Sequence, residues 1–449
     1  MKARPLTVLL AACCLHAVPA TAANTTAATI ATATVMDRAA IDVRGWAADT
    51  KGGSGGAIIR VTNLNAGGEG SLAAALATDG PRIIVFEVGG VIDLQGATLR
   101  INKPFVTVAG QTAPHPGVTL IRGGLSVSTS DVIIQHIAVR PGENGRPKKS
   151  GWDADGLSAG GASNLIVDHC SFSWATDENL SASGPRFNGS SPDDWPKHTS
   201  RRVTYSHNIV AEGLRNSTHG KGEHSKGTLI HDNAEQILLY GNLYTSNVER
   251  NPLVKGGAKV AFVNNLIHNP GKRAVHYNLI AHEWGERAPR TGAVTVIGNV
   301  LRAGPDTKRN TPLFSLGGSG DVSLFMQDNI AIDANGEPLP MTGRYTADTA
   351  KILHADQPYL PTGLAPLPAA GLESVIYASA GMRPWQRDAV DFKILSDVAE
   401  GRGNIVDSEA QSSGYPNYAP TRKAFVAGDW NLADMSPKAG WQSLVAKRP

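Results

Sequence analysis

The sequence is poor in cysteine, in charge and in long apolar runs, and each shortage excludes a class of protein. Three cysteines among 449 residues cannot build a disulfide framework. No apolar run reaches the roughly 20 residues that a membrane-spanning helix needs, so an integral membrane protein is excluded. Charged residues make up only 18% of the chain, and the net charge is +3. With an apolar share of 41%, this composition excludes disorder and supplies a core.

The first 22 residues have the composition of a secretory signal peptide. Lys2 and Arg4 precede an apolar stretch over residues 6–18, and Ala20-Thr21-Ala22 is a small-residue cleavage pattern. A competing pattern, Leu10-Ala11-Ala12-Cys13, resembles a bacterial lipobox and would leave Cys13 acylated. Both interpretations place the mature protein outside the cytoplasm. Loss of Lys2 and Arg4 lowers the net charge to +1, so nothing indicates a nucleic-acid partner.

Short apolar strands that end in a polar residue recur along the chain. Five of them end at Asn208, Asn242, Asn265, Asn299 and Asn329, with spacings of 34, 23, 34 and 30 residues. A period with a floor in the low twenties and a variable excess is typical of a parallel β-helix, in which each rung has about three short strands. The 49 glycines suit its many turns, and we expect the asparagines to stack in ladders at the bends. An antiparallel sandwich stays open as the alternative.

These patterns divide the chain into four parts. Residues 1–22 are the signal peptide, and residues 23–44 are an Ala/Thr-rich linker. The β-helix is expected over residues 45–335. Residues 336–449 are rich in proline and weakly helical from Trp385 to Val398, so we interpret them as a C-terminal extension that packs along the outside of the helix.

An acidic cluster is the first candidate for chemistry. Asp153 and Asp155 stand at positions i and i+2, which project from one face of an extended strand. Asp177 and Glu178 follow about one rung later, so that stacking brings the four carboxylates together laterally. Converging oxygen donors are what Ca²⁺ requires. Solvated turn acids without a ligand are the alternative.

A basic group follows one or two rungs further along the chain. It comprises Lys221, Arg250 and Lys255, and Pro252 rigidifies the loop after Arg250. Cations beside a metal cluster suit a polyanion whose carboxylates meet either the metal or a basic side chain. Two alternatives stay open here. The charges have no partner, or His219, His224 and Asp232 bind zinc, for which their spacing is unsuited.

Several ordered segments resemble the pectate lyases of polysaccharide lyase family 1, over about residues 45–335 and again around residues 387–391. They are Gly52–Gly56, Val61–Asn65 running into Gly68–Leu72, Gly110–Pro114, Val167–Trp174 with Asp177-Glu178, and Arg250–Leu253. The resemblance implies an all-β fold, a single-stranded right-handed parallel β-helix, which agrees with the repeats. It also implies Ca²⁺-dependent β-elimination of de-esterified homogalacturonan.

The resemblance implies a role for each candidate residue. Asp153 and Asp155 match paired calcium ligands, and either Asp177 or Glu178 supplies the next ligand. Arg250 matches an arginine that abstracts the proton. Lys221 and Lys255 match substrate-binding cations, whereas Asp168 and His169 match a motif that braces a turn.

We therefore predict a secreted, monomeric pectate lyase that uses Ca²⁺ and acts on polygalacturonate, giving 4,5-unsaturated oligogalacturonides. Three alternatives remain. They are a lyase for another polyuronate, a galacturonan hydrolase on the same fold with paired acid and base carboxylates, and a non-enzymatic β-helix adhesin.

Overall fold

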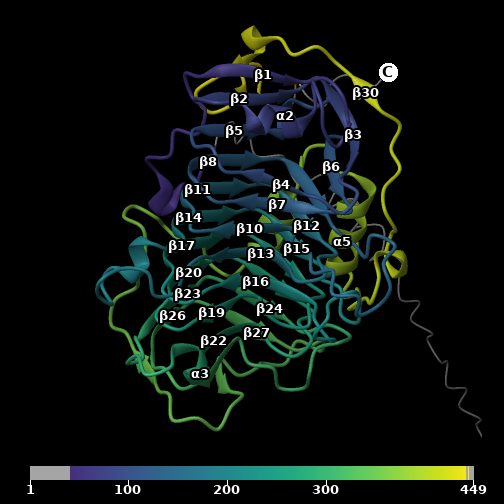
Figure 1. The fold of residues 1–449 in the computed structure, drawn as a ribbon. Helices are drawn as coiled ribbons and strands as arrows, with labels where there is room; N and C mark the ends of the chain where they lie inside the picture. The colour runs from purple at the N-terminus through teal and green to yellow at the C-terminus, as the bar shows by residue number, and fades with distance from the viewer. Residues whose placement is uncertain (1–40, 441–442, 444–449) are drawn as a thin grey trace, which may run out of the picture.

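The structure is a computed structural model that describes residues 41–440 and Ser443. The predicted signal peptide, the lipobox cysteine Cys13 and most of the predicted linker lie outside the described residues. Within residues 41–440, strands form three long sheets of eleven, nine and ten members and one two-stranded sheet. Figure 1 shows the strands of these sheets stacked along one axis, from the purple N-terminal strands to the green ones.

The eleven-stranded sheet comprises β1 (Ala57–Val61), β2 (Arg82–Phe86), β5 (Val106–Ala109), β8 (Ser130–Gln135), β11 (Ser163–Asp168), β14 (Arg201–Ser206), β17 (Glu235–Tyr240), β20 (Lys259–Val263), β23 (Gly292–Ile297), β26 (Val322–Gln327) and β29 (Ile352–His354). The nine-stranded sheet comprises β4 (Thr98–Ile101), β7 (Gly124–Val127), β10 (Leu157–Gly160), β13 (Glu178–Ser183), β16 (Lys226–Ile230), β19 (Leu253–Lys255), β22 (Val275–Leu279), β25 (Phe314–Gly318) and β28 (Thr342–Arg344).

The ten-stranded sheet comprises β3 (Val88–Asp93), β6 (Val118–Ile121), β9 (Ile137–Arg140), β12 (Ser171–Ser173), β15 (Ile209–Ala211), β18 (Leu243–Thr245), β21 (Leu266–His268), β24 (Val300–Arg302), β27 (Ile330–Ile332) and β30 (Thr421–Arg422). The two-stranded sheet pairs β31 (Trp430–Asn431) with β32 (Ser436–Pro437).

The chain visits the three long sheets in rotation. β11, β12 and β13 fall in the eleven-, ten- and nine-stranded sheets, respectively, and β14, β15 and β16 repeat the cycle one rung later. Neighbouring strands of the three long sheets are parallel, as the pairs β11 with β14 and β13 with β16 illustrate, except that β30 pairs antiparallel with β3. One turn of three strands per rung is a parallel β-helix, which confirms the predicted fold class.

Apolar side chains fill the interior in rows that follow the rungs. Val203, Ile237, Val260 and Val294 are in register on four adjacent strands, and all are buried in one core cluster. Side chains alternate along a strand, so every second residue points into this core and the residues between point out. The core is therefore one continuous apolar column, in which the inward side chains of each rung pack against those of the rungs on either side.

The predicted asparagine ladder is present at the bend between the eleven- and ten-stranded sheets. The side-chain amide of Asn242 donates to Asn265 Oδ1 at 2.9 Å, and the same pattern joins all five members in order: Asn208, Asn242, Asn265, Asn299 and Asn329. The left-handed conformation falls one residue earlier, for example at His207 (φ 53°) and Gly241 (φ 66°). Thus the ladder asparagines accept backbone N–H groups at the bend, and their neighbours make the turn.

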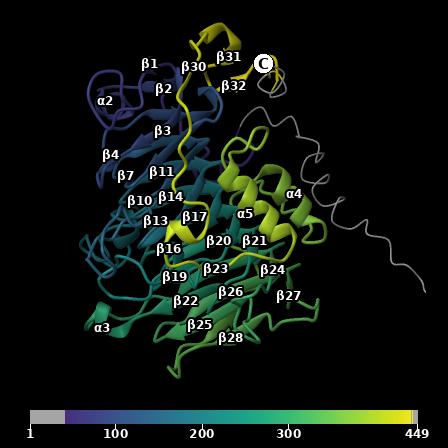
Figure 2. The same cartoon turned by 90° about the vertical axis from the view of Figure 1, so that its right-hand side faces the viewer.

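Four α-helices are described within residues 41–440. α2 (Leu72–Ala77) is capped at its N-terminus by Ser71, whose hydroxyl accepts the amide hydrogen of Ala74, and α3 (Ala281–Trp284) lies in an insertion after β22. α4 (Leu372–Ser379) and α5 (Ala389–Ala399) belong to the C-terminal extension. Figure 2 shows both helices lying along the outside of the β-helix.

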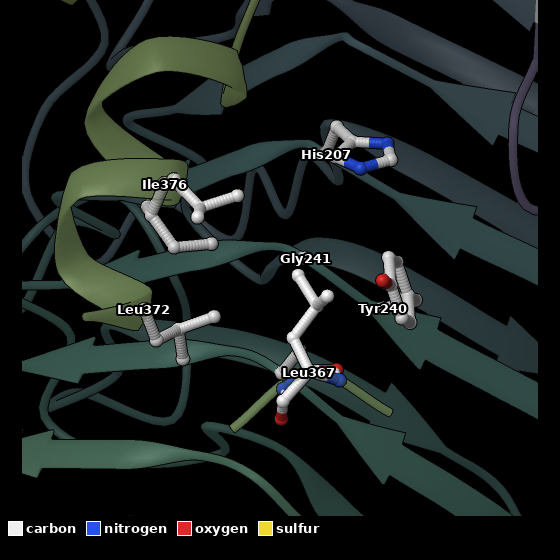
Figure 3. Close-up of a pocket in the computed structure, with 8 residues that line it drawn as sticks. His207, Tyr240, Gly241, Leu367, Leu372 and Ile376 are labelled. Carbon is white, nitrogen blue, oxygen red and sulfur yellow. Dashed lines mark hydrogen bonds between the residues drawn. The ribbon is translucent and has the colours of Figure 1, made fainter. Parts of the chain in front are cut away.

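The helices of the extension cover the ten-stranded sheet. Leu372 and Ile376 of α4 and Ile394 of α5 share one apolar cluster with sheet residues such as Leu243 and Leu266. A narrow pocket remains where α4 meets the bend; His207, Tyr240, Gly241, Leu367, Leu372 and Ile376 line it in Figure 3. None of the predicted site residues lines this pocket.

Arg140 fastens the start of α5 to the sheet. Its guanidinium donates to Asp388 at 2.6 Å and to Asp391 at 2.8 Å, and all three side chains are fully buried. Asp388 also caps α5 by accepting the amide hydrogen of Asp391. A buried charge that loses its partner is strongly unfavourable, so this triad fixes where the extension docks.

Both predicted borders of the β-helix differ from the structure. β28 and β29 extend the sheets to His354, beyond residue 335, although these short strands are mostly exposed. At the other end, Val43 packs on Leu238 of the eleven-stranded sheet, so the described end of the predicted linker is part of the folded unit. No helix within residues 41–440 is both long enough and apolar enough to span a bilayer.

Candidate functional site

Three carboxylates converge where two neighbouring rungs enter the nine-stranded sheet. Asp155 precedes β10, Asp177 precedes β13 and Glu178 begins β13. One oxygen of each lies within 4.8 Å of the others. The backbone N–H of Glu178 donates to Asp155 Oδ1 at 3.1 Å, which ties the two rungs together. The stacking of consecutive rungs thus brings together acids that are far apart in sequence.

Asp153 lies beside this group rather than in it. Residues 152–156 form an irregular segment, so Asp153 and Asp155 do not share the face of a strand as predicted. Asp153 keeps 41% of its side chain exposed, and its Oδ1 accepts a 3.4 Å hydrogen bond from the backbone of Gly220. Its other oxygen, Oδ2, is 3.7 Å from His219 Nε2.

The pKa values of Asp155 and Asp177 shift in opposite directions. Burial and the nearby charge of Asp177 raise the pKa of Asp155 to about 7. Burial also favours a higher pKa for Asp177, but the hydrogen bond from His224 and the charges of His224 and His219 outweigh it and lower the pKa. The group therefore carries negative charge that its protein neighbours only partly compensate.

Arg250 reaches the acids from the following rungs. Its Nη1 contacts Glu178 Oε1 in an ion pair, and 22% of its side chain is exposed. Its backbone has a φ of 63°, a conformation rare for non-glycine residues, which aims the side chain from the turn ahead of β19. Burial lowers the pKa of Arg250, whereas the charges of Asp177 and Asp155 act to raise it.

The two predicted substrate-binding lysines have different surroundings. Lys221 is exposed in the loop between β15 and β16, and its backbone N–H donates to His219 Nδ1 at 3.1 Å. Lys255 ends β19 with a side chain only 7% exposed, and its ammonium pairs with Glu283 and with Asp232 at 3.4 Å. The loop of Lys221 contacts Asp153 through the backbone N–H of Gly220, whereas Lys255 belongs to a separate ionic network.

Arg186 also belongs to the ionic network of Lys255, Glu283 and Asp232. Because Asp232 is engaged there, it does not join His219 and His224 in a zinc site. Arg186 donates to Asp232 at 2.9 Å and to Glu283 at 2.7 Å. Asp232 also accepts a 2.8 Å hydrogen bond from the indole of Trp284. His219 and His224 instead face Asp177, so the three residues do not form one ligand set.

Sequence reasoning missed Lys226, a cation in direct register with the acids. Lys226 on β16 lies opposite Glu178 in the strand register between β16 and β13, and its ammonium forms an ion pair with Glu249. Burial and the neighbouring Arg273 lower the pKa of Lys226 to about 8. The sequence signal for Lys226 is its position at the start of a strand one rung after Glu178. That position identifies Lys226 as a neighbour of the acids only when the strand register is known.

Asp168 and His169 form a buried hydrogen-bonded group at the bend, away from this site. Asp168 Oδ2 lies 2.8 Å from His169 Nδ1, and Oδ1 accepts a 2.7 Å hydrogen bond from Ser206. His207 Nδ1 lies 3.2 Å from the same Oδ1, and its ring stacks on His169 with centroids 4.6 Å apart. Its position between strands agrees with the predicted bracing of a turn.

Comparison with curated proteins gives relatives that are named probable pectate lyase C. The Aspergillus flavus protein is 38% identical over 264 residues, which cover 59% of this chain but only 54% of that relative. The Aspergillus fumigatus protein is 32% identical over 379 residues, covering 82% of this chain and 79% of the relative. No family model matches the chain.

Comparison with solved structures supports the fold. The cedar-pollen allergen Jun a 1 superposes with a TM-score of 0.53, covering 76% of this chain and 92% of the allergen at 15% identity. The thermostable pectate lyase PL 47 gives 0.51, covering 77% of this chain and 99% of that structure, also at 15% identity. With the 32% identity over most of the Aspergillus fumigatus protein, these findings show that the chain belongs to the pectate lyases of polysaccharide lyase family 1.

Proposed function

We propose that this protein is an extracytoplasmic pectate lyase that cleaves de-esterified homogalacturonan by Ca²⁺-dependent β-elimination, releasing 4,5-unsaturated oligogalacturonides. The observation that carries the proposal is the convergence of Asp155, Asp177 and Glu178 within 4.8 Å, with Arg250 paired to Glu178. Membership of the pectate lyase family and the apolar, Ala-x-Ala-terminated N-terminus support the substrate and the location.

The acidic group fits a calcium ion. Ca²⁺ takes six to eight oxygen ligands, and three carboxylates at this separation supply the protein share. Asp153 is proposed as a further ligand, because it and Asp177 face the same His219 Nε2 atom at 3.7 and 3.8 Å. Burial and the charge of Asp177 raise the pKa of Asp155 to about 7, and a bound cation would oppose this rise by stabilising the ionised carboxylate. When bound, Ca²⁺ neutralises a substrate carboxylate and so acidifies the adjacent C5 proton.

Arg250 is the proposed base, because it is the partly exposed cation in contact with the acidic group. Burial lowers its pKa and so increases the share of the neutral form that can accept a proton. Arg250 takes the proton from C5. The electrons of that C–H bond form the C4–C5 double bond, and the glycosidic C4–O bond breaks to release the leaving chain.

The outward face of the nine-stranded sheet suits a polymer that lies across the rungs. Ser126, Ser158 and Ser181 are in register on β7, β10 and β13, and they alternate with the core residues Leu157 and Leu180. These small polar side chains therefore lie on the face opposite the core, where Ser126 and Ser158 are partly exposed and Ser181 is buried.

Cations at both borders of this face complete the proposed substrate site. Lys221 is exposed on the loop above the acids and is proposed to bind a substrate carboxylate. Lys255 keeps this proposed role only if a substrate carboxylate displaces Glu283, its present partner. Lys226, in register with Glu178, is a third candidate.

Ultraviolet absorbance of the unsaturated product tests the proposal. The protein is incubated with polygalacturonate, with Ca²⁺, with a chelator and then with Ca²⁺ restored. We expect absorbance to rise with Ca²⁺, to stop with chelator and to resume on restoration. Reducing ends released without absorbance, in the presence of chelator, would indicate a hydrolase instead, and inactivity on this substrate but activity on alginate would indicate a lyase for another polyuronate.

A further inference from the structure

Two buried histidines beside the acidic group have no role in the proposed reaction. His219 and His224 lie in the loop between β15 and β16, with 2% and 6% of their surfaces exposed. Their rings stack with centroids 3.5 Å apart and planes 13° apart. Both Nε2 atoms face Asp177, at 3.8 Å from His219 and 2.8 Å from His224. Their arrangement fits either metal ligands or hydrogen-bond donors, and these differ in their chemistry.

The surroundings of His219 indicate a donor. The backbone N–H of Lys221 donates to His219 Nδ1 at 3.1 Å, so Nδ1 carries the lone pair. A neutral imidazole with its lone pair on Nδ1 carries its hydrogen on Nε2. This Nε2–H group points between Asp153 Oδ2 at 3.7 Å and Asp177 Oδ2 at 3.8 Å. A metal at Nε2 would require a hydrogen on Nδ1, facing the N–H of Lys221.

The geometry of His224 also indicates a donor. Its Nε2 is 2.8 Å from Asp177 Oδ1, which is a direct hydrogen bond. Two ligands of one tetrahedral metal, with bonds of about 2.1 Å, lie farther apart, at about 3.4 Å. A histidine that binds a metal also donates its other ring N–H to a partner. His224 Nδ1 is buried and has no hydrogen-bond partner among the described residues.

We infer that His219 and His224 are positioning residues that hold the carboxylate of Asp177 toward Asp155 and Glu178. His224 does so through a hydrogen bond from Nε2 at 2.8 Å, and His219 through an Nε2–H group that faces the same carboxylate at 3.8 Å. The inference rests on the proposed function, because it assigns a role toward the same calcium site. Its physical basis is that a carboxylate held by fixed donors does not have to be ordered when the ion binds.

The backbone of the loop supports this role, because it fixes the imidazoles to the segment that carries the acids. Thr218 Oγ1 donates to the carbonyl of Trp152 at 2.6 Å, and the N–H of Gly151 donates to the carbonyl of Thr218 at 2.8 Å. On the other side, the N–H of His224 donates to the carbonyl of Arg215 at 2.7 Å. Hydrogen bonds therefore hold the loop next to His219 and at His224, and they keep the two stacked imidazoles facing Asp177.

Calcium titration calorimetry on the full chain tests the inference with two substitutions at one position. In His224→Gln, the side-chain amide nitrogen replaces Nε2–H, whereas His224→Leu removes the donor at similar volume. We expect His224→Leu to weaken Ca²⁺ binding by roughly 10-fold or more, as loss of a partner of a metal ligand does. His224→Gln should stay within about threefold of the wild type. His354→Leu, at an exposed histidine on the eleven-stranded sheet, is the matched control.

The outcomes distinguish histidines that position Asp177 from histidines that bind a metal, and from a protein that binds no calcium. Equal Ca²⁺ affinity in all variants overturns the inference and leaves the proposed function intact. Loss in both Leu and Gln variants, with Zn²⁺ binding the wild type more tightly than Ca²⁺, identifies the imidazoles as ligands and also overturns it. A wild type that binds no Ca²⁺ refutes the calcium dependence itself and the inference with it. If His224→Leu does not fold, His224→Asn, whose amide is too short to reach, should show the same loss.

Discussion

The asparagine ladder makes a quantitative prediction about what holds the rungs in place. Asn242 is fully buried, and its amide donates to the carbonyl of Tyr205 and to Asn265 Oδ1, both at 2.9 Å. Its Oδ1 accepts the backbone N–H of Asn208 at 2.9 Å. Replacing Asn242 by Leu, which is similar in size, orphans the backbone N–H of Asn208 and the carbonyl of Tyr205. The side-chain amide of Asn208 also loses its acceptor on Asn242, but it keeps its hydrogen bond to the carbonyl of Val167. Asn265 Oδ1 keeps a backbone donor.

Two orphaned buried groups at about 1–3 kcal/mol each lower the unfolding free energy by about 2–6 kcal/mol. Asn329→Leu is the matched control, because this last member of the ladder is only half-buried and water can replace its hydrogen bonds. We expect it to cost less than about 2 kcal/mol. Urea unfolding followed by tryptophan fluorescence measures both. A loss below about 1 kcal/mol in Asn242→Leu, or an equal loss in both variants, would refute the reasoning.

Two further predictions concern catalysis and pH. Arg250→Ala should lower kcat on polygalacturonate by about 10²–10⁴-fold, the usual contribution of a general base, and a near-normal rate in the folded variant would exclude Arg250 from that role. Burial lowers the pKa of His268 to about 3 and that of His276 well below its usual 6.5. As the pH falls below about 6.5, the unfolded chain therefore binds protons that the folded chain does not, and each histidine lowers stability by up to about 1.4 kcal/mol per pH unit. Calorimetry should record a lower Tm at pH 5 than at pH 7, and an unchanged Tm would contradict the burial of neutral imidazoles.

Much of the fold was predictable because its determinants are local and repeated. A strand that ends in asparagine, such as the one ending at Asn242, contains the core residues, the bend and the ladder amide of one rung. Stacking then follows from burial of the apolar rows. The late strands β28 and β29 were not predicted, because Thr342–Arg344 and Ile352–His354 lie in a proline-rich stretch and are mostly exposed, so they lack an apolar pattern.

The candidate site was only partly predictable, because side-chain partners depend on register and loop path. One rung of spacing indicated that Asp155 and Glu178 would meet, and the structure brings their side chains together. The partners of Lys255 were not predictable, since Glu283 comes from an insertion after β22 whose path the sequence does not encode in any simple pattern. The same holds for His224, which reaches Asp177 across an irregular loop.

The identity of the chain ends tests the central claim most directly. Polygalacturonate is digested with the protein and Ca²⁺, and the oligomers are analysed by mass spectrometry. β-Elimination predicts that one fragment of each cleavage carries an unsaturated end and is lighter by one water than the saturated oligomer of the same length. It also predicts that no such fragments form when a chelator is present. Saturated oligomers alone would mean that water was added across the bond, which contradicts elimination by Arg250 at the acidic group of Asp155, Asp177 and Glu178.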